Sequence, residues 1–191
     1  MYFKLTRLAA LRPCRWIADW PYVDGADFDM GTRISVPVPK PLEFVLEPLN
    51  PKSDQHGPEM PALFNIAVPL FRDDLVAAMT AGGVDNVDCY DAVVREPDGS
   101  KAYTNYKAAN VVGLVAAADM GRSTATVHPG GPVIDVEFDE LVLDPARARG
   151  ALIFRLAEAT ASIFVHDRLR AHLIASGFDE LTFLPPGEAF V

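Results

Sequence analysis

The side chains best suited to chemistry in this 191-residue sequence are four histidines, two cysteines and a run of carboxylates. Two histidines bind a metal from one helix only at a spacing of three or four, where both rings share a face. His166 and His172 are six residues apart, so they predict no such pair. The patterns GxSxG, GxxxxGK[ST], GxGxxG and HExxH are also missing from the sequence. The sequence therefore predicts no catalytic residue, no metal site and no cofactor.

The carboxylates lie in the run Asp135-Val136-Glu137-Phe138-Asp139. The two-residue period of a strand puts Asp135, Glu137 and Asp139 on one face, with neighbours about 7 Å apart, and turns Val136 and Phe138 toward a core. Three interpretations remain open: a solvated sheet face, a docking surface for a basic partner, or a divalent-metal or paired acid/base site. The last requires closer, convergent oxygens. The functional hypothesis is that the three acids contact a partner.

Three large aromatic residues, Trp16, Trp20 and Tyr22, lie in an irregular acidic stretch near the N-terminus. Aromatic side chains supply the core of many domains and the anchors of many interfaces. We expect these three in the core, with partner-binding anchors as the alternative. The cysteines Cys14 and Cys89 are far apart in the chain and predict two separate thiols, without a disulfide framework or a zinc site.

The regular elements around these side chains follow from apolar spacing and from the positions of glycine and proline. Leu75, Ala78 and Met79 predict a helix over 73–81 that Gly82-Gly83 ends, and a second helix is predicted over 166–176. Prolines between 37 and 61 exclude a helix or a central strand there, allow an edge strand over 42–46, and indicate an exposed loop over 50–61. Further strands are predicted over 2–6, 84–95, 103–115, 133–143, 152–156 and 181–184.

Residues 73–90 align with 167–184 without a gap, and both segments read as a helix, a glycine stop and a strand. The identities include Leu75 with Leu169 and Gly83 with Gly177. The alignment predicts two similar helix-strand units in a pseudo-symmetric core, each helix packing on a shared sheet; convergence on a common pattern is the alternative. The predicted fold is α+β, with a mostly antiparallel sheet and a few packed helices. One domain over 1–191 is expected, with a Pro-rich part over 1–62 and a core over 63–191.

The charge of the chain limits its partners. With 17 basic and 26 acidic residues the net charge is −9, which disfavours binding to nucleic acid and favours either ordinary solubility or attraction to a basic partner. No apolar run approaches the ~20 residues that cross a bilayer, and the first residues do not resemble a signal peptide. We therefore expect a cytoplasmic protein that binds no membrane.

Three segments give a family resemblance: Ile66–Phe71 with Gly83–Val87, Tyr106–Val115, and Leu141–Phe178. In order and spacing they resemble the myxobacterial-type immunity protein family, the eleventh of the polymorphic-toxin immunity proteins. The resemblance implies a non-enzymatic protein that neutralises a cognate toxin by binding it, and a basic toxin would suit the acidic surface. Two alternatives remain open. One is a small hydrolase or metal-dependent enzyme using His128 or His166 with Asp135 or Asp167, and the other is a ligand-sensing or scaffold module. The oligomeric state stays open.

Overall fold

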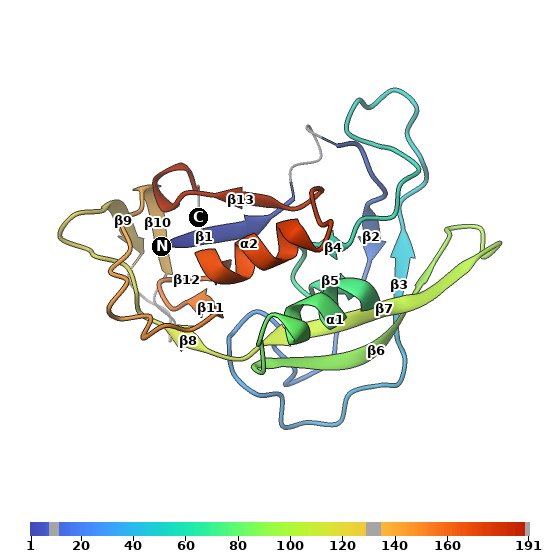
Figure 1. Ribbon diagram of the computed structural model, residues 1–191. Coiled ribbons are helices and arrows are strands. Elements are labelled where there is room, and N and C mark those ends of the chain that lie inside the picture. The colour runs from blue at the N-terminus through green and yellow to red at the C-terminus, as the bar shows by residue number, and fades with distance from the viewer. Residues whose placement is uncertain (8–11, 129–134, 190–191) are drawn as a thin grey trace.

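The computed structural model describes residues 1–7, 12–128 and 135–189, and its strands form three sheets (Figure 1). The five-stranded sheet has the order β13-β1-β12-β11-β8, with bounds Thr182–Leu184, Tyr2–Thr6, Ala159–His166, Ile153–Leu156 and Leu114–Val115. The six-stranded sheet has the order β2-β3-β6-β7-β5-β4, with bounds Ile17–Asp19, Leu42–Leu46, Val87–Arg95, Ala102–Val111, Leu70–Arg72 and Leu63–Phe64. A two-stranded ribbon joins β9 (Thr124–His128) to β10 (Asp135–Glu140).

Two α-helices, α1 (Asp73–Ala81) and α2 (Asp167–Ala175), lie side by side against the sheets, and a short 3-10 helix follows at Pro186–Glu188 (Figure 1). Most strand pairs are antiparallel; β3 with β6 and β11 with β8 are parallel. The α+β class and the mostly antiparallel pairing predicted from the sequence are therefore confirmed. Both predicted helices are confirmed as well, with His166 immediately before the first turn of α2.

The two helix-strand units predicted from the sequence alignment are present, and each is part of a larger four-stranded unit. The first has the strand order β6-β7-β5-β4 with α1 between β5 and β6, and the second has β13-β1-β12-β11 with α2 between β12 and β13. All neighbouring strands within both units are antiparallel. The strand equivalent to β7 in the second unit is β1, which precedes that unit in the chain. The two units are thus related by a circular permutation.

Local geometry repeats between the two units. The glycines that end the helices, Gly83 and Gly177, have φ angles of 93° and 91°, in the left-handed region that favours glycine. Equivalent backbone hydrogen bonds close each unit: Arg72 N donates to Ala62 O at 2.9 Å, and His166 N donates to Leu152 O at 2.8 Å. Such agreement in hydrogen bonds and dihedral angles supports a structural repeat.

One core cluster joins the two units. Leu75 and Met79 of α1 and Leu169 and Leu173 of α2 are each no more than 2% exposed, and they pack with side chains from both large sheets. At the junction, Asn86 Nδ2 donates to Val112 O at 2.6 Å and to Ile153 O at 3.0 Å. The equivalent residue of the second unit, Glu180, accepts from Ala62 N at 3.1 Å. Each unit therefore uses the same position to contact the backbone at the start of the end strand of the other, at Ile153 in β11 and at Ala62 just before β4.

Three expectations about the strands were wrong. The helices do not share one sheet, because β1 and β7 belong to separate sheets. The segment 42–46 is an interior strand between β2 and β6, since its prolines flank it and leave every backbone donor within it available. The segment 103–115 is not one strand. It ends at Val111, turns at Gly113 with a φ of 141°, and continues as β8 in the other sheet.

Candidate partner-binding surface

The side chain of each of the four histidines contacts another group of the protein. His166 is the N-cap of α2: its Nδ1 accepts from Arg168 N at 3.1 Å, and desolvation lowers the pKa of the ring. Nε2 of His172 lies 3.0 Å from Ala78 O across the helix pair, and this ring is partly buried. His56 lies 3.5 Å from Glu47, and His128 lies 3.6 Å from Glu137.

The alternative of a hydrolase or metal enzyme gains no geometric support from these contacts. The carboxylate of Asp167 accepts from Arg170 at 2.9 Å, so its ionic partner is an arginine. Within residues 1–7, 12–128 and 135–189, no group of three or more His, Cys, Asp or Glu side chains is arranged to hold a metal ion. The arrangement around the histidines stabilises helix ends and strand pairs.

The acidic residues of β10 lie on an exposed face, as the strand period predicts. Val136 and Phe138 are 4% and 3% exposed and join the core cluster under the ribbon, whereas Glu137 and Asp139 are exposed. The backbone of Asp135 pairs with His128, and its side chain lies outside the described part of the structure. The inward and outward pattern of β10 is therefore confirmed for four of these five positions.

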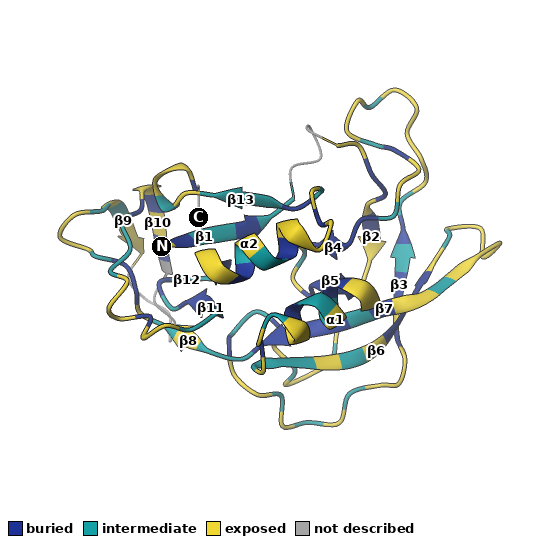
Figure 2. Ribbon diagram, in the orientation of Figure 1, coloured by how far each residue is buried: buried dark blue, intermediate teal, exposed yellow. Residues whose placement is uncertain are grey.

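The aromatic residues near the N-terminus are on the surface, so the expectation that they are in the core is wrong. Trp16 is 37% exposed, Trp20 41% and Tyr22 88% (Figure 2 shows this region). The physical reason is that β2 is the end strand of its sheet, and its pairing with β3 contains a register shift. Within β2, Ile17 alone is buried, and the aromatic residues flank the strand instead of packing under it.

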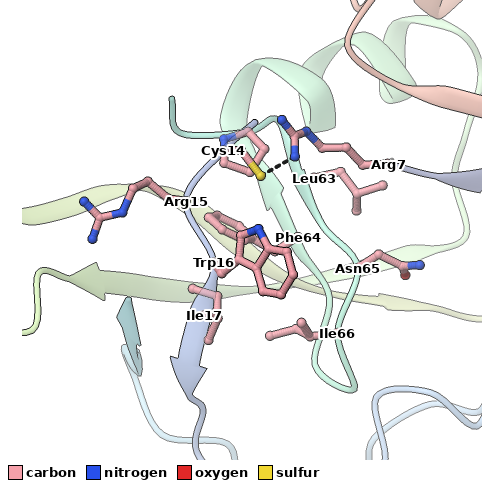
Figure 3. Close-up of a pocket in the computed structure, with 10 residues that line it drawn as sticks. Arg7, Cys14, Arg15, Trp16, Ile17, Leu63, Phe64, Asn65 and Ile66 are labelled. Carbon is pink, nitrogen blue, oxygen red and sulfur yellow. Dashed lines mark hydrogen bonds between the residues drawn. The ribbon is translucent and has the colours of Figure 1, made fainter. Parts of the chain in front are cut away.

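A pocket of about 300 Å³ adjoins Trp16 (Figure 3). Most of its wall is apolar and comes from β2, β4 and the segments beside them: Trp16, Ile17, Pro61, Leu63, Phe64 and Ile66. Arg7, Cys14, Arg15 and Asn65 complete the lining. The exposed Trp16 ring also packs on His56, with ring centroids 4.6 Å apart, which restricts its motion. The pocket is thus a largely apolar cavity with an aromatic side chain at its rim.

The charged and sulfur groups of the pocket have internal partners. Arg7 Nη1 donates to the Cys14 thiol (Figure 3), and Arg15 Nη2 lies 2.7 Å from Glu96 and 3.0 Å from Glu47 O. Burial raises the pKa of the Cys14 thiol, although the Arg7 guanidinium opposes this. The thiol is therefore held in its protonated form, which is a poor nucleophile. Cys14 and Cys89 are both free, as predicted.

Comparison with known proteins identifies the family. A model of the immunity protein family (Imm11) matches residues 73–187. The chain belongs to this family. The matched segment holds α1, α2 and all strands from β6 to β13, and it confirms the resemblance found in the sequence. No curated protein matches the chain. In the described part of this immunity protein, no helix is long and apolar enough to cross a membrane.

The loop after β2 in the immunity protein is held by buried polar side chains of the family core. Arg155 is 1% exposed, and its guanidinium donates to Phe28 O at 3.0 Å and to Thr160 O at 2.7 Å. Desolvation lowers the Arg155 pKa to about 10, still far above neutral pH, so the group stays charged. Asn110, also fully buried, donates to Thr32 O at 2.8 Å.

Sequence reasoning did not find these anchors. A single arginine or asparagine in a strand has no pattern that distinguishes a buried anchor from an exposed side chain. The structure also leaves the two groups of candidate residues apart. The β10 acids lie on the ribbon at one side of Figure 1, and the aromatic residues lie around β2 at the other, with both helices between them.

Proposed function

We propose that this immunity protein neutralises the cognate toxin of a bacterial polymorphic toxin system by binding it, without catalysis, in the cytoplasm. Membership of the immunity protein family carries the proposal. The contacts of the histidines and of Cys14 support the non-catalytic part, since each group already has a structural partner. An inhibitor needs an exposed complementary surface and no reacting group.

We propose further that residues 1–191 act as one immunity-type domain. The Pro-rich part over 1–62 supplies β1 to the five-stranded sheet and β2 and β3 to the six-stranded sheet. Because β1 completes the second four-stranded unit, the core over 63–191 would lose an interior strand without it. Removing 1–62 should therefore abolish folding, which a soluble-expression and circular-dichroism test of the truncated chain measures.

Two surfaces are candidates for toxin contact. One is the acidic face of β10, with Asp135, Glu137 and Asp139; the other is the aromatic surface of Trp16, Trp20 and Tyr22. A specific interface buries about 800 Å² on each partner. The two surfaces lie on opposite sides of the helix pair in Figure 1, so they are alternatives for one toxin domain. A basic toxin suits either surface, because the chain carries a net charge of −9.

The decisive experiment combines this protein with the toxin domain encoded beside it. Co-expression is expected to rescue growth, and the two chains are expected to purify together. In a titration of the purified toxin, activity should fall in proportion to added immunity protein and reach zero near equal molar amounts. Complete protection at a small fraction of an equivalent would indicate turnover and contradict the non-catalytic mechanism. Absence of both rescue and complex formation would contradict the proposed function itself.

A further inference from the structure

The exposed apolar residues of this protein concentrate around β2. Among the described residues, nine large hydrophobic side chains are exposed, and three of them, Trp16, Trp20 and Tyr22, lie within seven consecutive positions. Exposed Asp19 and Asp24 lie between and after them. We call these five residues the acidic aromatic edge. Clustered exposed apolar side chains beside polar ones are typical of protein-binding surfaces.

The charge of this surface has one sign. Residues 16–32 contain four aspartates and no lysine or arginine. The preceding basic residue, Arg15, is 7% exposed and paired with Glu96, and the following one, Arg33, pairs with Asp88 at 3.0 Å. Neither arginine therefore offsets the edge with an unpaired positive charge. A second copy of the same surface would be repelled, whereas a lysine- or arginine-rich surface would be attracted.

The edge also borders a cavity that can receive a side chain. The pocket beside Trp16 has a volume of about 300 Å³, and apolar side chains form most of its wall. Hot spots of protein interfaces are typically such pockets, filled by one large side chain of the partner and surrounded by a rim that excludes water. Trp16 at the rim of the pocket provides both the wall and the adjoining apolar area.

The loop that follows the edge is ordered before any partner binds. Arg155 and Asn110 hold the carbonyls of Phe28 and Thr32, and the buried Phe28 ring packs edge-on against Tyr90 at 5.4 Å. Buried contacts of this kind reduce the conformational entropy that ordering a binding surface would otherwise cost. A preorganised surface that combines aromatic side chains, acids and a pocket is suited to tight binding.

From these observations we infer that the acidic aromatic edge is the toxin-binding surface, and that it fits a lysine- or arginine-rich face of the toxin from which one apolar side chain enters the pocket beside Trp16. The inference rests on the proposed function and names its interface. It selects the edge over the acidic face of β10, because the edge combines acids with three exposed aromatic side chains, one of which lines a pocket. A pocket also borders β10 at Glu140, but neither Glu137 nor Asp139 lines it.

Both tryptophans of the chain, Trp16 and Trp20, belong to the edge, so they report on it directly. The immunity protein is labelled with 5-fluorotryptophan and mixed with the unlabelled toxin domain encoded beside it. Trp16→Phe and Trp20→Phe variants assign the two fluorine resonances. Both resonances are expected to shift or broaden on saturation with toxin. Complex formation seen by size-exclusion chromatography with both resonances unchanged would overturn the inference and leave the proposed function intact.

Matched variants give the second measurement. Trp20→Ala and Tyr22→Ala are expected to weaken binding by about tenfold or more each, as for anchors at the centre of an interface. Ile174→Ala, at a 45% exposed position of α2, is the control and should leave the affinity within twofold. Unchanged affinity in both aromatic variants would overturn the inference.

Charge variants separate the two surfaces. Asp19→Lys with Asp24→Lys changes the net charge as much as Glu137→Lys with Asp139→Lys. The edge pair is expected to slow association and to reduce its salt dependence, while the β10 pair leaves the affinity nearly unchanged. The opposite order would move the interface to β10 and overturn the inference. Absence of any complex with the unsubstituted chain would instead contradict the proposed function, and the inference with it.

Discussion

Tyr106 lies fully buried in β7, and its hydroxyl donates to Pro61 O at 2.7 Å. We predict that Tyr106→Phe lowers stability at neutral pH and raises it relative to the unsubstituted chain at strongly alkaline pH. At neutral pH the variant loses one buried hydrogen bond and leaves a carbonyl unsatisfied, at a cost of about 1–2 kcal/mol. Burial raises the Tyr106 pKa above its usual value of 10.0, so the hydroxyl stays protonated in the folded state as the pH rises.

The sign of the pH effect follows from proton linkage. A raised pKa means that, above the unfolded pKa of about 10, the Tyr106 hydroxyl keeps its proton in the folded state and loses it in the unfolded state. The contribution of this hydroxyl to the unfolding free energy is therefore complete below about pH 10 and is lost as the pH rises further. Ionisation of one unfolded tyrosine at about pH 11.5 favours unfolding by about 2 kcal/mol. Phenylalanine has no such proton to lose. The stabilities of the two proteins should therefore become equal near about pH 11 and then exchange order.

Urea unfolding followed by circular dichroism at about pH 8 and about pH 11.5 measures both differences. The difference between the two proteins removes the contribution of all other titrating groups. Tyr22→Phe, at an 88% exposed tyrosine, is the matched control and should change the unfolding free energy by less than about 0.5 kcal/mol at pH 8. An equal cost of Tyr106→Phe at both pH values would refute the reasoning, because it would mean that burial does not hold the proton.

Three further predictions concern the repeated units. Leu75→Ala and Leu169→Ala, at equivalent and fully buried positions, should each lower the unfolding free energy by about 3–5 kcal/mol in urea titrations. An unfolding free energy that stays nearly unchanged in either variant would contradict the shared core. His166→Ala should lower the unfolding free energy by about 1 kcal/mol above pH 6.5. The loss should be smaller at lower pH, because the ring pKa is depressed in the folded state and the unfolded chain therefore takes up a proton first. A loss that does not change with pH would argue against the cap. Gly82→Ala should lower the melting temperature more than the control Gly187→Ala. A Cβ at position 82 would lie 2.9 Å from the imidazole of His172 in the opposite helix, whereas a Cβ at position 187 would have nothing within 4 Å. Equal melting temperatures of the two variants would contradict the close approach.

Local patterns in the sequence predicted the parts of the fold that local chemistry determines. The glycine stops after both helices and the alternation along β10 were correct because each depends on a few consecutive residues. The sheet order was not predictable in the same way. The position of β1 between β12 and β13 depends on a pairing between segments about 160 residues apart, as in Phe3 with Val165.

The exposure of the aromatic residues was missed for a related reason. A tryptophan next to a short apolar segment predicts a core position when the segment is interior, and the sequence does not show that β2 ends its sheet. Exposure of Trp16 and Trp20 depends on the absence of a further strand beside β2 in the sheet order of the described residues. The candidate site could therefore be named from residue type, but its location on the surface required the tertiary structure.

The two four-stranded units also explain where a partner-specific surface can be placed. The family match spans 73–187, which holds both helices and the core strands β6, β7, β11, β12 and β13, so these positions are constrained by the shared core. Beyond β6 the first unit is extended by β3 and β2, whereas the equivalent strand of the second unit, β13, ends its sheet. The extension breaks the symmetry between the units and lies outside the matched segment. Changes to side chains on its exposed edge would leave the packing of the two units intact, so the proposed toxin-binding edge can vary in sequence without loss of the fold.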